Sequence, residues 1–442
     1  MEHKVFAYQT LDSVREEAKR LDAFIPLCED LSALSASLTV EGMTVPNRLM
    51  VQPMEGCDGT LDGTPDELTV RRYRRFASGG AGLIWFEAVA VTPESRASPK
   101  QLILTKDNLD AYKRLLDDMR ETSRKTCGFV PPVIIQATHS GRYSKPVSTP
   151  APLIAYNNPH YEKAGPLDAD RIVTDEYLDT LPERYAQNAR LSREAGFDGV
   201  DVKACHRYLL NELLSARTRE NSRYGGSFEN RIRLFLDAVK AVQSEVSGGM
   251  FVTTRVNMYD GVEYPYGFGA DEKGGLAPDL TESLELVKRL KECGIKLINI
   301  TIGNPYVNPH VNRPFDKGFY IPPEHPLEGL GRMYTCVKAV KDAYPDLTVV
   351  ASGLSYLRQF SPYAAAGLLD CGAADLIGYG REAFAYPEFA RDILQDGSLN
   401  KDKCCISCGK CSELMRAGST AGCVIRDKTY ADIYKRDVSD KQ

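Results

Sequence analysis

The stretch LTESLELVKRLKECGIKLINITIG, residues 280–303, contains the unit from which most of the chain is built. Its first part repeats apolar residues with the period of an amphipathic helix. Gly294 follows, placed to end that helix in the left-handed conformation that glycine adopts easily. The apolar run 297–303 comes next and indicates a strand buried on both faces, as in parallel sheets. The stretch therefore predicts one helix followed by one parallel strand.

Apolar runs of this kind recur along the chain, and eight can be counted. They alternate with segments of helical period, such as residues 178–196, which also end on a glycine. Eight strand–helix units over about 350 residues predict an α/β fold, a (β/α)8 TIM barrel. The predicted strands are LMVQPM (49–54), GLIWFEA (82–88), PVIIQAT (132–138), GVDVKA (199–204), MFVTTRV (250–256), LINITIG (297–303), TVVASG (348–353) and DLIGYG (375–380).

An open, doubly wound sheet is the alternative fold for alternating strands and helices. It predicts fewer strands and a glycine-rich phosphate turn after the first one. The residues at that position, VQPMEGCDG (51–59), do not match G-x-G-x-x-G. The barrel is therefore the prediction.

Three regions follow from this pattern. Residues 1–40 are expected to form an N-terminal helical extension that packs on the outside of the barrel. Residues 41–398 are expected to form the barrel, and residues 399–442 a cysteine-rich tail.

The composition is that of a globular protein, with 43% hydrophobic and 26% charged residues. A net charge of −5 gives no reason to expect a nucleic acid or a membrane surface as partner. No apolar segment has the length of a signal peptide, and none approaches the roughly 18 residues of a membrane-spanning helix. We therefore expect a cytoplasmic protein, in which scattered thiols stay reduced.

Polar side chains follow several predicted strands, at the end of the barrel where the chemistry of this fold takes place. Two connecting loops, 139–175 and 303–330, are long enough to cover a site. The polar residues at strand ends are Gln136, His139 and Arg142; Lys203, His206, Arg207 and Tyr208; Arg255; Asn304 and Tyr306; and Gly380 with Arg381.

Glycine-containing turns after the last two strands predict an anion site. Gly353 follows strand seven, and Gly380 with Arg381 follows strand eight, so backbone N–H groups and a guanidinium would meet there. This is the usual phosphate position of the fold. The amide of Gln136 is suited to reading a planar heterocycle, and Arg255 to neutralising a charge that develops on it.

The segment FDGVDVKACHRYLLNELLSARTRENSRYGGSFENRIR, residues 197–233, resembles the old yellow enzyme family of FMN-dependent ene reductases. In that family a strand leads to a donor pair, a tyrosine and a YGGS-x-ENR-x-R segment, here YGGSFENRIR (224–233). The cysteine tail narrows the resemblance to the branch with 2,4-dienoyl-CoA reductase and trimethylamine dehydrogenase, which carry a [4Fe–4S] cluster after the barrel. Four more stretches agree in order and spacing: NRLMVQPM (47–54), GGAGLIWFEA (79–88), QATHSGR (136–142) and ADLIGYGREAFAYPEFARDI (374–393).

The resemblance implies FMN as cofactor and a reduction as the reaction. In that family the flavin passes a hydride from N5 to the β-carbon of an activated alkene, and a protein acid gives a proton to the α-carbon. The implied FMN contacts are Pro53, Met54, Glu55 and Ala88 beside the isoalloxazine ring, Gln136 at its pyrimidine edge, Arg255 at the N1/O2 region, and Gly353, Gly380 and Arg381 at the phosphate.

The donor segment departs from the family pattern. Relatives have His-x-x-His or His-x-x-Asn followed by x-Tyr, whereas this chain reads Lys203-Ala-Cys-His206-Arg-Tyr208. The resemblance implies His206 as donor to a substrate oxygen and Tyr208 as proton donor. Lys203 is a compact cation in place of the first donor, which favours an anionic substrate or a poorly stabilised enolate. Alternatively, Lys203 turns away and pairs with Glu55 or Glu87.

A second departure follows strand six. The dienoyl-CoA reductases have a catalytic histidine there, in a GIGWHE-like segment, whereas this chain has TIGNPYVNPH (301–310). Tyr306 and His310 are the candidates to replace it. The departure makes dienoyl-CoA a less expected substrate than another α,β-unsaturated carbonyl compound or carboxylate.

Cys405, Cys408, Cys411 and Cys423 have the spacing C-x2-C-x2-C-x11-C. Four thiolates are the complement that a [4Fe–4S] cluster requires. The relatives have C-x2-C-x3-C-x11-C, so one spacing is a residue shorter here, and Cys404 offers a second register. A structural zinc site is the alternative, because zinc sites with four cysteine ligands and C-x2-C spacing are common. The resemblance favours the cluster.

A cluster beside FMN implies one-electron transfer. In the longer relatives electrons arrive from an FAD/NAD(P)H domain, but this sequence ends nineteen residues after Cys423 without a G-x-G-x-x-G motif. We therefore expect an external donor protein, namely ferredoxin, flavodoxin or an NADH-oxidising flavoprotein, with NAD(P)H as an indirect electron source. We also expect a role in anaerobic metabolism. The sequence leaves open whether the protein forms a homo-oligomer. The alternatives are an oxidative reaction like that of the amine dehydrogenases and a non-catalytic redox subunit.

Overall fold

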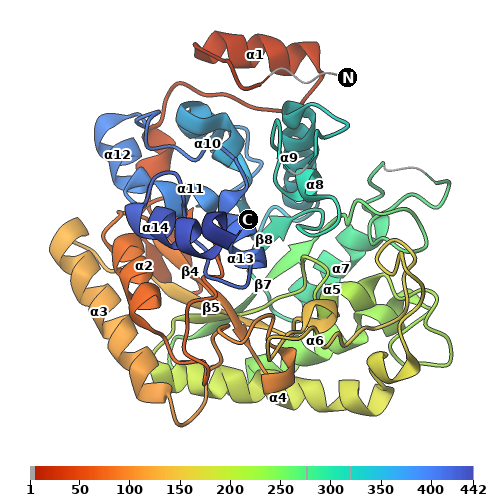
Figure 1. Cartoon of the computed structure of the whole chain (residues 1–442). Helices are drawn as coiled ribbons and strands as arrows, with labels where there is room; N and C mark the ends of the chain where they lie inside the picture. Colours follow the sequence, from red (N-terminus) through yellow and green to blue (C-terminus); the bar gives the residue numbers. More distant parts are fainter. Residues whose placement is uncertain (1–4, 275–276, 319, 442) are drawn as a thin grey trace.

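Eight parallel strands form a closed barrel in the computed structural model, which describes residues 5–274, 277–318 and 320–441 (Figure 1). The strands follow one another around the barrel in chain order, and β10 (Leu376–Tyr379) closes it by pairing with β3 (Leu49–Val51). The (β/α)8 prediction is confirmed, with all eight strands in their predicted places. The others are β4 (Leu83–Ala90), β5 (Val133–Thr138), β6 (Gly199–Val202), β7 (Phe251–Asn257), β8 (Leu297–Thr301) and β9 (Thr348–Ala351).

Helices surround the barrel, and several of them, α4 (Asp175–Ala195) and α7 (Thr281–Glu292) included, are followed by a glycine in the left-handed conformation. α4 ends at Gly196, with φ 98°, and Gly294, with φ 90°, follows α7. Other residues are strained in this left-handed conformation. The remaining helices are α1 (Leu11–Arg20), α2 (Glu67–Ala77), α3 (Leu109–Cys127), α5 (Leu209–Leu214), α6 (Phe228–Glu245), α8 (Pro309–Asn312), α9 (Pro326–Ala343), α10 (Ser361–Asp370), α11 (Arg381–Ala385), α12 (Phe389–Asp396), α13 (Lys410–Arg416) and α14 (Lys428–Asp437).

A β-hairpin that the sequence pattern did not predict closes the amino-terminal end of the barrel. β1 (Leu38–Val40) and β2 (Met43–Val45) pair antiparallel, and the boundary expected between residues 40 and 41 falls at their turn. Val40 and Val45 are buried against apolar side chains inside the barrel, Trp85 among them. The hairpin leaves the carboxyl end of the strands as the open end.

The inside of the barrel changes from apolar to polar towards that open end. Trp85 marks the change, because its ring packs in the apolar layer while its Nε1 donates to Asp201 at 2.8 Å. Gln52 and Asn299 face each other across the barrel and form two side-chain hydrogen bonds, of 3.2 and 2.8 Å. Because buried polar groups need partners, this layer forms a paired floor beneath the site.

The N-terminal segment packs on the outside of the barrel. α1 lies above α9 and α10 in Figure 1. Val14 and Ala18 on α1 are buried as part of the main hydrophobic core, and the N–H of Cys28 donates to the carbonyl of Tyr363 on α10 at 2.9 Å. Among the described helices, none combines the length and the apolar composition that crossing a bilayer demands.

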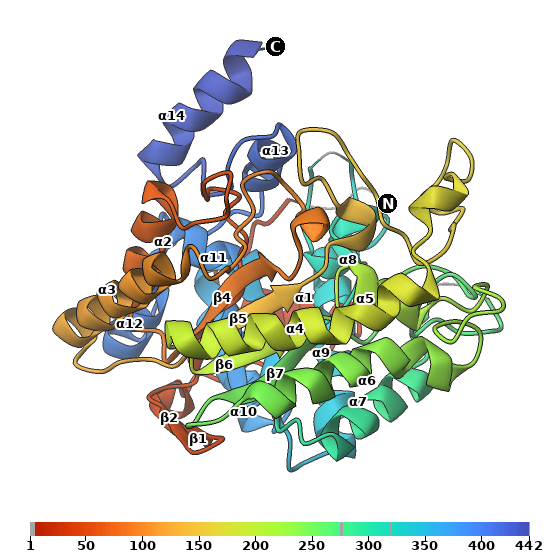
Figure 2. The same cartoon turned by 90° about the horizontal axis from the view of Figure 1, so that it is seen from below.

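The C-terminal tail folds back over the carboxyl end of the barrel. The N–H of Ala421 donates to the carbonyl of Gly56, in the loop after β3, at 2.7 Å. Asp427, at the start of α14, accepts hydrogen bonds of 2.8 and 3.0 Å from Arg71 on α2. Figure 2 shows α14 projecting at the edge of the molecule, with the C-terminus at its tip. The tail is thereby placed against the same end of the barrel as the polar strand ends.

Candidate functional site

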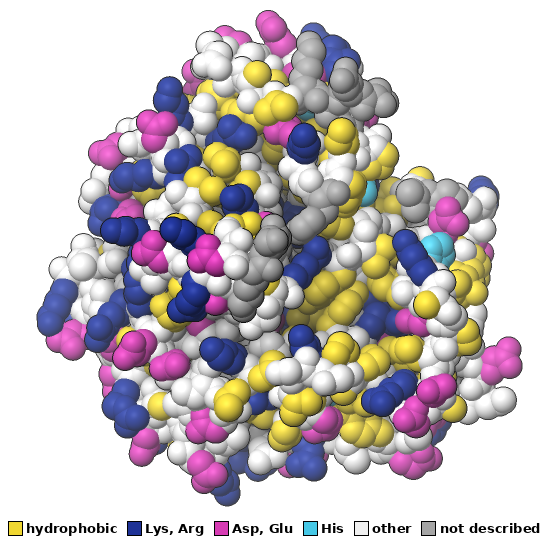
Figure 3. Space-filling view, in the orientation of Figure 1, with side chains coloured by type: hydrophobic (Ala, Val, Ile, Leu, Met, Phe, Trp, Pro, Cys, Tyr) yellow, Lys and Arg dark blue, Asp and Glu magenta, His cyan; other side chains and the backbone are white. Residues whose placement is uncertain are grey.

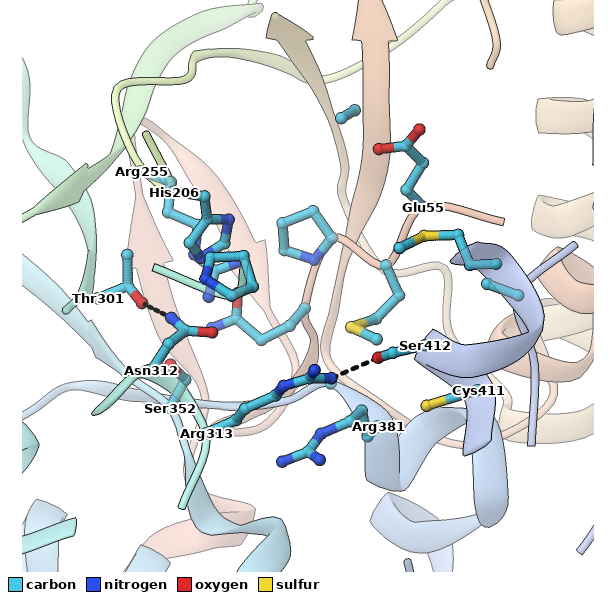
Figure 4. Close-up of a pocket in the computed structure, with 18 of the residues that line it drawn as sticks. Glu55, His206, Arg255, Thr301, Asn312, Arg313, Ser352, Arg381, Cys411 and Ser412 are labelled. Carbon is cyan, nitrogen blue, oxygen red and sulfur yellow. Dashed lines mark hydrogen bonds between the residues drawn. The ribbon is translucent and has the colours of Figure 1, made fainter. Parts of the chain in front are cut away.

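One cavity at the carboxyl end of the barrel brings together every residue that the sequence analysis assigned to FMN or to the substrate (Figure 4). It is also lined by Cys411 of the tail. In the space-filling view, hydrophobic side chains line a hollow in this face of the molecule, with lysine and arginine side chains beside it (Figure 3). The twelve assigned residues are Pro53, Met54, Glu55, Ala88, Gln136, Lys203, His206, Tyr208, Arg255, Gly353, Gly380 and Arg381.

Asp201 organises the floor of this cavity, and the sequence analysis missed it. Its carboxylate accepts from Gln136 Nε2 at 2.6 Å, from the N–H of Arg255 at 2.7 Å and from Trp85. Because Gln136 donates its NH2 group to Asp201, its carbonyl oxygen is the part left for a ligand. Burial raises the pKa of Asp201 to about 6, against the effect of these hydrogen bonds. The sequence feature that could have identified Asp201 is its charge inside the apolar run GVDVKA (199–204).

The predicted anion site lies between the last two strands of the barrel. Gly353, with φ 97°, follows β9, and Gly380 precedes α11, whose first residue is Arg381. A side chain at Gly380 would come within 3.0 Å of the Met54 sulfur. Ser352 and Gly353 line the cavity together with Gly380 and Arg381.

The turn after β6 aims the proposed catalytic residues at the cavity. His206 and Arg207 both have positive φ, 63° and 64°, a conformation that non-glycine residues hold only when their surroundings enforce it. Arg207 supplies that enforcement from inside the protein: it bonds to Asp260 at 3.1 Å and to the hydroxyl of Tyr156 at 2.6 Å. The neighbouring His206 and Tyr208 line the cavity as a result.

His206 lines the cavity as a neutral imidazole. Its Nε2 is buried, with no hydrogen-bond partner among the described residues. Burial, and then the positive charges of Arg255 and Lys203, lower the pKa of His206 well below its usual value. The imidazole is therefore uncharged at neutral pH and has a ring nitrogen available to a ligand.

Tyr208 lies between a cation and a second tyrosine. The Nζ of Lys203 is 3.8 Å from the centre of the Tyr208 ring, and the hydroxyls of Tyr208 and Tyr306 are 3.3 Å apart. Burial, followed by the neighbouring Tyr306 and Glu55, raises the pKa of Tyr208 well above its usual value. The phenol therefore stays protonated at neutral pH.

The sequence left open a pairing of Lys203 with Glu55 or Glu87. The two carboxylates differ in their contacts. Glu87 is bound by Arg72 at 2.7 Å and by the N–H of Gly56 at 2.8 Å. Glu55 lines the cavity with Lys203 and acts on its pKa through its charge. Burial lowers the pKa of Lys203 despite that carboxylate. Lys203 thus faces the cavity, with Glu55 as its acidic neighbour there.

The long connection after β8 is called the strap below and comprises the described residues 303–318 and 320–325. Its Tyr306 enters the cavity and stacks on Tyr143 with the ring centres 3.7 Å apart. His310 instead bonds through Nδ1 to the hydroxyl of Tyr320 at 2.6 Å and is not among the cavity residues. Of the two candidates to replace the histidine of the relatives, Tyr306 is therefore the one beside Tyr208.

The four predicted cluster cysteines line a second cavity. The N–H of Ser407 donates to Cys405 Sγ, and the N–H of Arg426 to Cys423 Sγ, both at 3.4 Å. Arg381, Phe384 and Cys411 line both this cavity and the large one, which therefore share a wall. The cavity residues include the complete set Cys405, Cys408, Cys411 and Cys423.

Cys404 lines the same cavity but differs from these four cysteines in its hydrogen bonds. Its thiol donates to the carbonyl of Asn400 at 3.4 Å, and it also hydrogen-bonds with Glu382. Glu382, on α11, in turn accepts the N–H of Cys405 at 2.9 Å and so fixes the start of the cysteine loop. Within residues 5–274, 277–318 and 320–441, no three His, Cys, Asp or Glu side chains converge closely enough to hold a single metal ion.

A family model described as the NADH:flavin oxidoreductase / NADH oxidase family matches residues 34–306. The chain belongs to this family. It is accordingly a flavin-dependent oxidoreductase, and the predicted membership of the old yellow enzyme family is confirmed. Membership also supports NAD(P)H as a source of reducing equivalents.

Curated members of the family match much of the chain. An NADPH dehydrogenase of Halalkalibacterium halodurans is 31% identical over 275 residues, which cover 61% of this chain and 73% of the relative. An NADH oxidase of Thermoanaerobacter brockii is 25% identical over 423 residues, covering 91% of this chain but 58% of the relative.

Solved structures share the fold at low sequence identity. A 2-naphthoyl-CoA reductase in complex with 2-naphthoyl-CoA superposes with a TM-score of 0.74 at 19% identity, over 92% of this chain and 58% of that one. A histamine dehydrogenase from Rhizobium sp. 4-9 superposes with a TM-score of 0.70 at 22% sequence identity, over 91% of this chain and 53% of that one. The old yellow enzyme homologue from Zymomonas mobilis superposes with a TM-score of 0.63 at 20% sequence identity, over 84% of this chain and 94% of that one. The chain thus spans little more than half the length of the two larger proteins.

Proposed function

We propose that the protein is an FMN-dependent ene reductase that reduces the C=C bond of an α,β-unsaturated carbonyl compound or carboxylate and receives electrons through a [4Fe–4S] cluster. The observation that carries the proposal is the wall of Arg381, Phe384 and Cys411 shared by the two cavities. A flavin in the large cavity would be a direct neighbour of a cluster in the small one.

The large cavity suits FMN because it contains buried polar groups that lack partners among the described residues. The Nε of Arg255 is one such group, and the Nε2 of His206 is another. Buried polar groups are normally hydrogen-bonded, so a polar ligand is expected here. When bound, FMN supplies the hydride of the reaction. The pyrimidine part would be held by Gln136 and Arg255, and the phosphate by Gly353, Gly380 and Arg381.

Three side chains are placed to act on the substrate. Neutral His206 donates an N–H to the substrate's carbonyl or carboxylate oxygen, and the nearby charge of Lys203 stabilises the negative charge that develops there. Tyr208, held protonated, gives its phenolic proton to the α-carbon. Tyr306 hydrogen-bonds with Tyr208 and so restrains the direction of that hydroxyl.

The cysteine cavity suits a [4Fe–4S] cluster better than a single ion. Such a cluster takes one thiolate from each of four cysteines, so its ligands surround a space instead of converging on a point. The described cysteines line a cavity in this way, and two of their sulfurs already accept backbone N–H groups, as ligand sulfurs of such clusters do. Cys404 also lines this cavity, but its thiol donates to the carbonyl of Asn400, and we therefore leave it out of the proposed ligand set.

The test is to prepare the protein without oxygen, with FMN and iron–sulfur cluster loaded, and to mix the dithionite-reduced form with enones and enoates. We expect rapid reoxidation of the flavin and formation of the saturated product. NADH, NADPH and reduced ferredoxin, offered separately, identify the reductant. If none of the C=C compounds reoxidises the reduced flavin, while amines bleach the oxidised flavin in a separate sample, the reaction runs in the oxidative direction and the proposal is wrong.

A further inference from the structure

Arg313 reaches from the strap across the mouth of the cavity towards the cysteine tail (Figure 4). Its base is fixed, because the neighbouring Asn312 donates to the hydroxyl of Thr301 at 3.1 Å and to the carbonyl of Ile302 at 2.8 Å. Its far end donates to the hydroxyl of Ser412 on α13. Between these two anchors, the Nε of Arg313 is buried without a hydrogen-bond partner among the described residues.

The electrostatic surroundings of Arg313 are unusual for an arginine that is half-buried. Arg381 lies next to it, and the other groups that act on its charge are Cys411, Arg416 and Tyr320, none of which is a carboxylate. Burial and the charge of Arg381 lower the pKa of Arg313 to about 10. Two guanidinium groups side by side, each only partly exposed to water, repel each other unless an anion lies between them. The two guanidinium groups are therefore suited to binding an anion between them.

We propose that Arg313 and Arg381 clamp the phosphate monoester of the flavin cofactor, and that Arg313 ties this phosphate to α13, the helix that carries Cys411. The inference rests on the proposed FMN site but concerns a residue outside the set that the family resemblance assigned. A phosphate monoester fits because it has close to two negative charges at neutral pH and several oxygens for planar guanidinium groups. The backbone turns at Gly353 and Gly380 lie at the same end of the cavity.

The clamp has a consequence for the tail. Arg313 is bonded to Ser412, and Arg416, one turn further along α13, donates to the carbonyl of Pro305 in the strap at 3.1 Å. Phosphate binding would hold the strap in place and would therefore hold α13 against the barrel. The cofactor's phosphate, far from its reactive ring, would then steady a ligand of the proposed cluster.

The first experiment compares FMN with riboflavin, which differs only by the phosphate. Cluster-loaded, flavin-depleted protein is titrated with each flavin, and the ratio of the two Kd values measures what the phosphate contributes. Arg313→Gln should weaken FMN binding by roughly ten- to hundred-fold, the loss expected for charge-assisted hydrogen bonds, and leave riboflavin binding unchanged. Arg313→Lys should give an intermediate loss, because lysine keeps the charge but not the two-pronged geometry.

Lys317→Gln is the matched control. It removes a positive charge from the same strap, four residues away, but the Lys317 side chain is exposed and lies outside the large cavity. This variant should leave the ratio of Kd values as in the wild type. Riboflavin binding in each variant reports whether the site is still folded. An unchanged ratio in Arg313→Gln overturns the clamp, and so does a rise in the substrate KM with FMN affinity intact, which would assign the anion site to the substrate. The proposed ene reduction would survive either result.

The second experiment tests the link to the tail by hydrogen exchange of residues 410–416. FMN should slow exchange in α13 at least several-fold more than riboflavin does, since exchange follows the local opening equilibrium. In Arg313→Gln the two flavins should have the same effect. Equal protection by FMN and riboflavin in the wild type would overturn the link.

Discussion

Tyr208 is the side chain on which proton delivery depends in the proposed reaction. Tyr208→Phe removes one hydroxyl and keeps the ring beneath Lys203, so the cavity should keep its shape. We expect reoxidation of reduced enzyme by an enone to slow by on the order of 10²-fold or more, the usual loss for a missing general acid. Single-turnover absorbance of the flavin measures it, with FMN content and dithionite reduction as controls. An unchanged rate would remove Tyr208 from the mechanism.

Asp201 makes stability depend on pH in a defined direction. Its pKa is raised to about 6 in the folded protein, from about 4 in an unfolded chain. A carboxyl group of this kind stabilises the fold below its unfolded pKa, and that contribution is lost as the pH rises through its folded pKa. Two pKa units correspond to about 3 kcal/mol.

The measurement compares the flavin-free wild type with Asp201→Asn by urea unfolding from pH 4 to pH 6. The free energy of unfolding of the wild type should fall by about 2 kcal/mol relative to the variant across this window, because the loss begins below pH 4 and is completed only above pH 6. A difference between the two proteins that stays constant with pH would show that Asp201 has an ordinary pKa.

Among the elements, the strap and α11 connect the two cavities. The strap contributes Tyr306 beside the proposed proton donor and Arg313 beside α13. α11 contributes Arg381 and Phe384 to the shared wall, while its Glu382 fixes the N–H of Cys405. A change in either element should therefore be felt on both the flavin side and the cysteine side.

The contact between α14 and α2 decides how firmly the tail is held. Asp427 caps α14 by accepting the N–H of Thr429 at 3.1 Å and pairs with Arg71. Losing the cap and the half-buried ion pair together should cost about 1–3 kcal/mol of local stability. In Asp427→Ala we expect the cluster to be lost to a chelator roughly ten-fold faster or more, because the tail opens more often.

The control for this prediction is Asp432→Ala, an exposed acidic residue on the same helix. It should lose its cluster at the wild-type rate. The barrel of Asp427→Ala should keep its FMN affinity, which separates loosening of the tail from general unfolding. Equal chelation rates for the two variants would mean that the contact between Asp427 and Arg71 does not hold the tail.

At the scale of the whole molecule, the hairpin β1–β2 closes one end of the barrel and the tail covers the other. The flavin cavity lies between the open strand ends and the tail, and the cysteine cavity lies in the tail itself. Electrons from outside would reach the substrate through two adjoining compartments. Because the two cavities are separate, we predict that the tail can lose the proposed cluster while the barrel keeps FMN.

Cys423→Ser tests that division. Iron content should fall from about four per chain, whereas FMN binding and reoxidation of dithionite-reduced flavin by an enone should be retained. Reduction by a one-electron protein donor should fall to background. Flavin reduction by that donor at the wild-type rate would overturn the proposed electron path, and zinc in place of iron in the wild type would establish the structural alternative.

The sequence alone determined the barrel and the positions of most site residues. The apolar runs and helical periods are local, and a glycine such as Gly196 or Gly294 marks a helix end without reference to distant parts of the chain. Because parallel strands in a barrel all present their carboxyl ends to one side, residues at strand ends, such as Gln136, Arg255 and Arg381, could be assigned to one site before any contact was known.

Only the tertiary structure decided which groups pair and which remain available. Asp201 draws its partners from three other strands, Tyr306 rather than His310 enters the cavity, and Arg313 meets Ser412 from a distant loop. The seal formed by β1 and β2 likewise depends on strands that follow it in the chain. The physical reason is common to all of these cases. Each is a contact between segments far apart in sequence, and local patterns contain no information on which distant groups will meet.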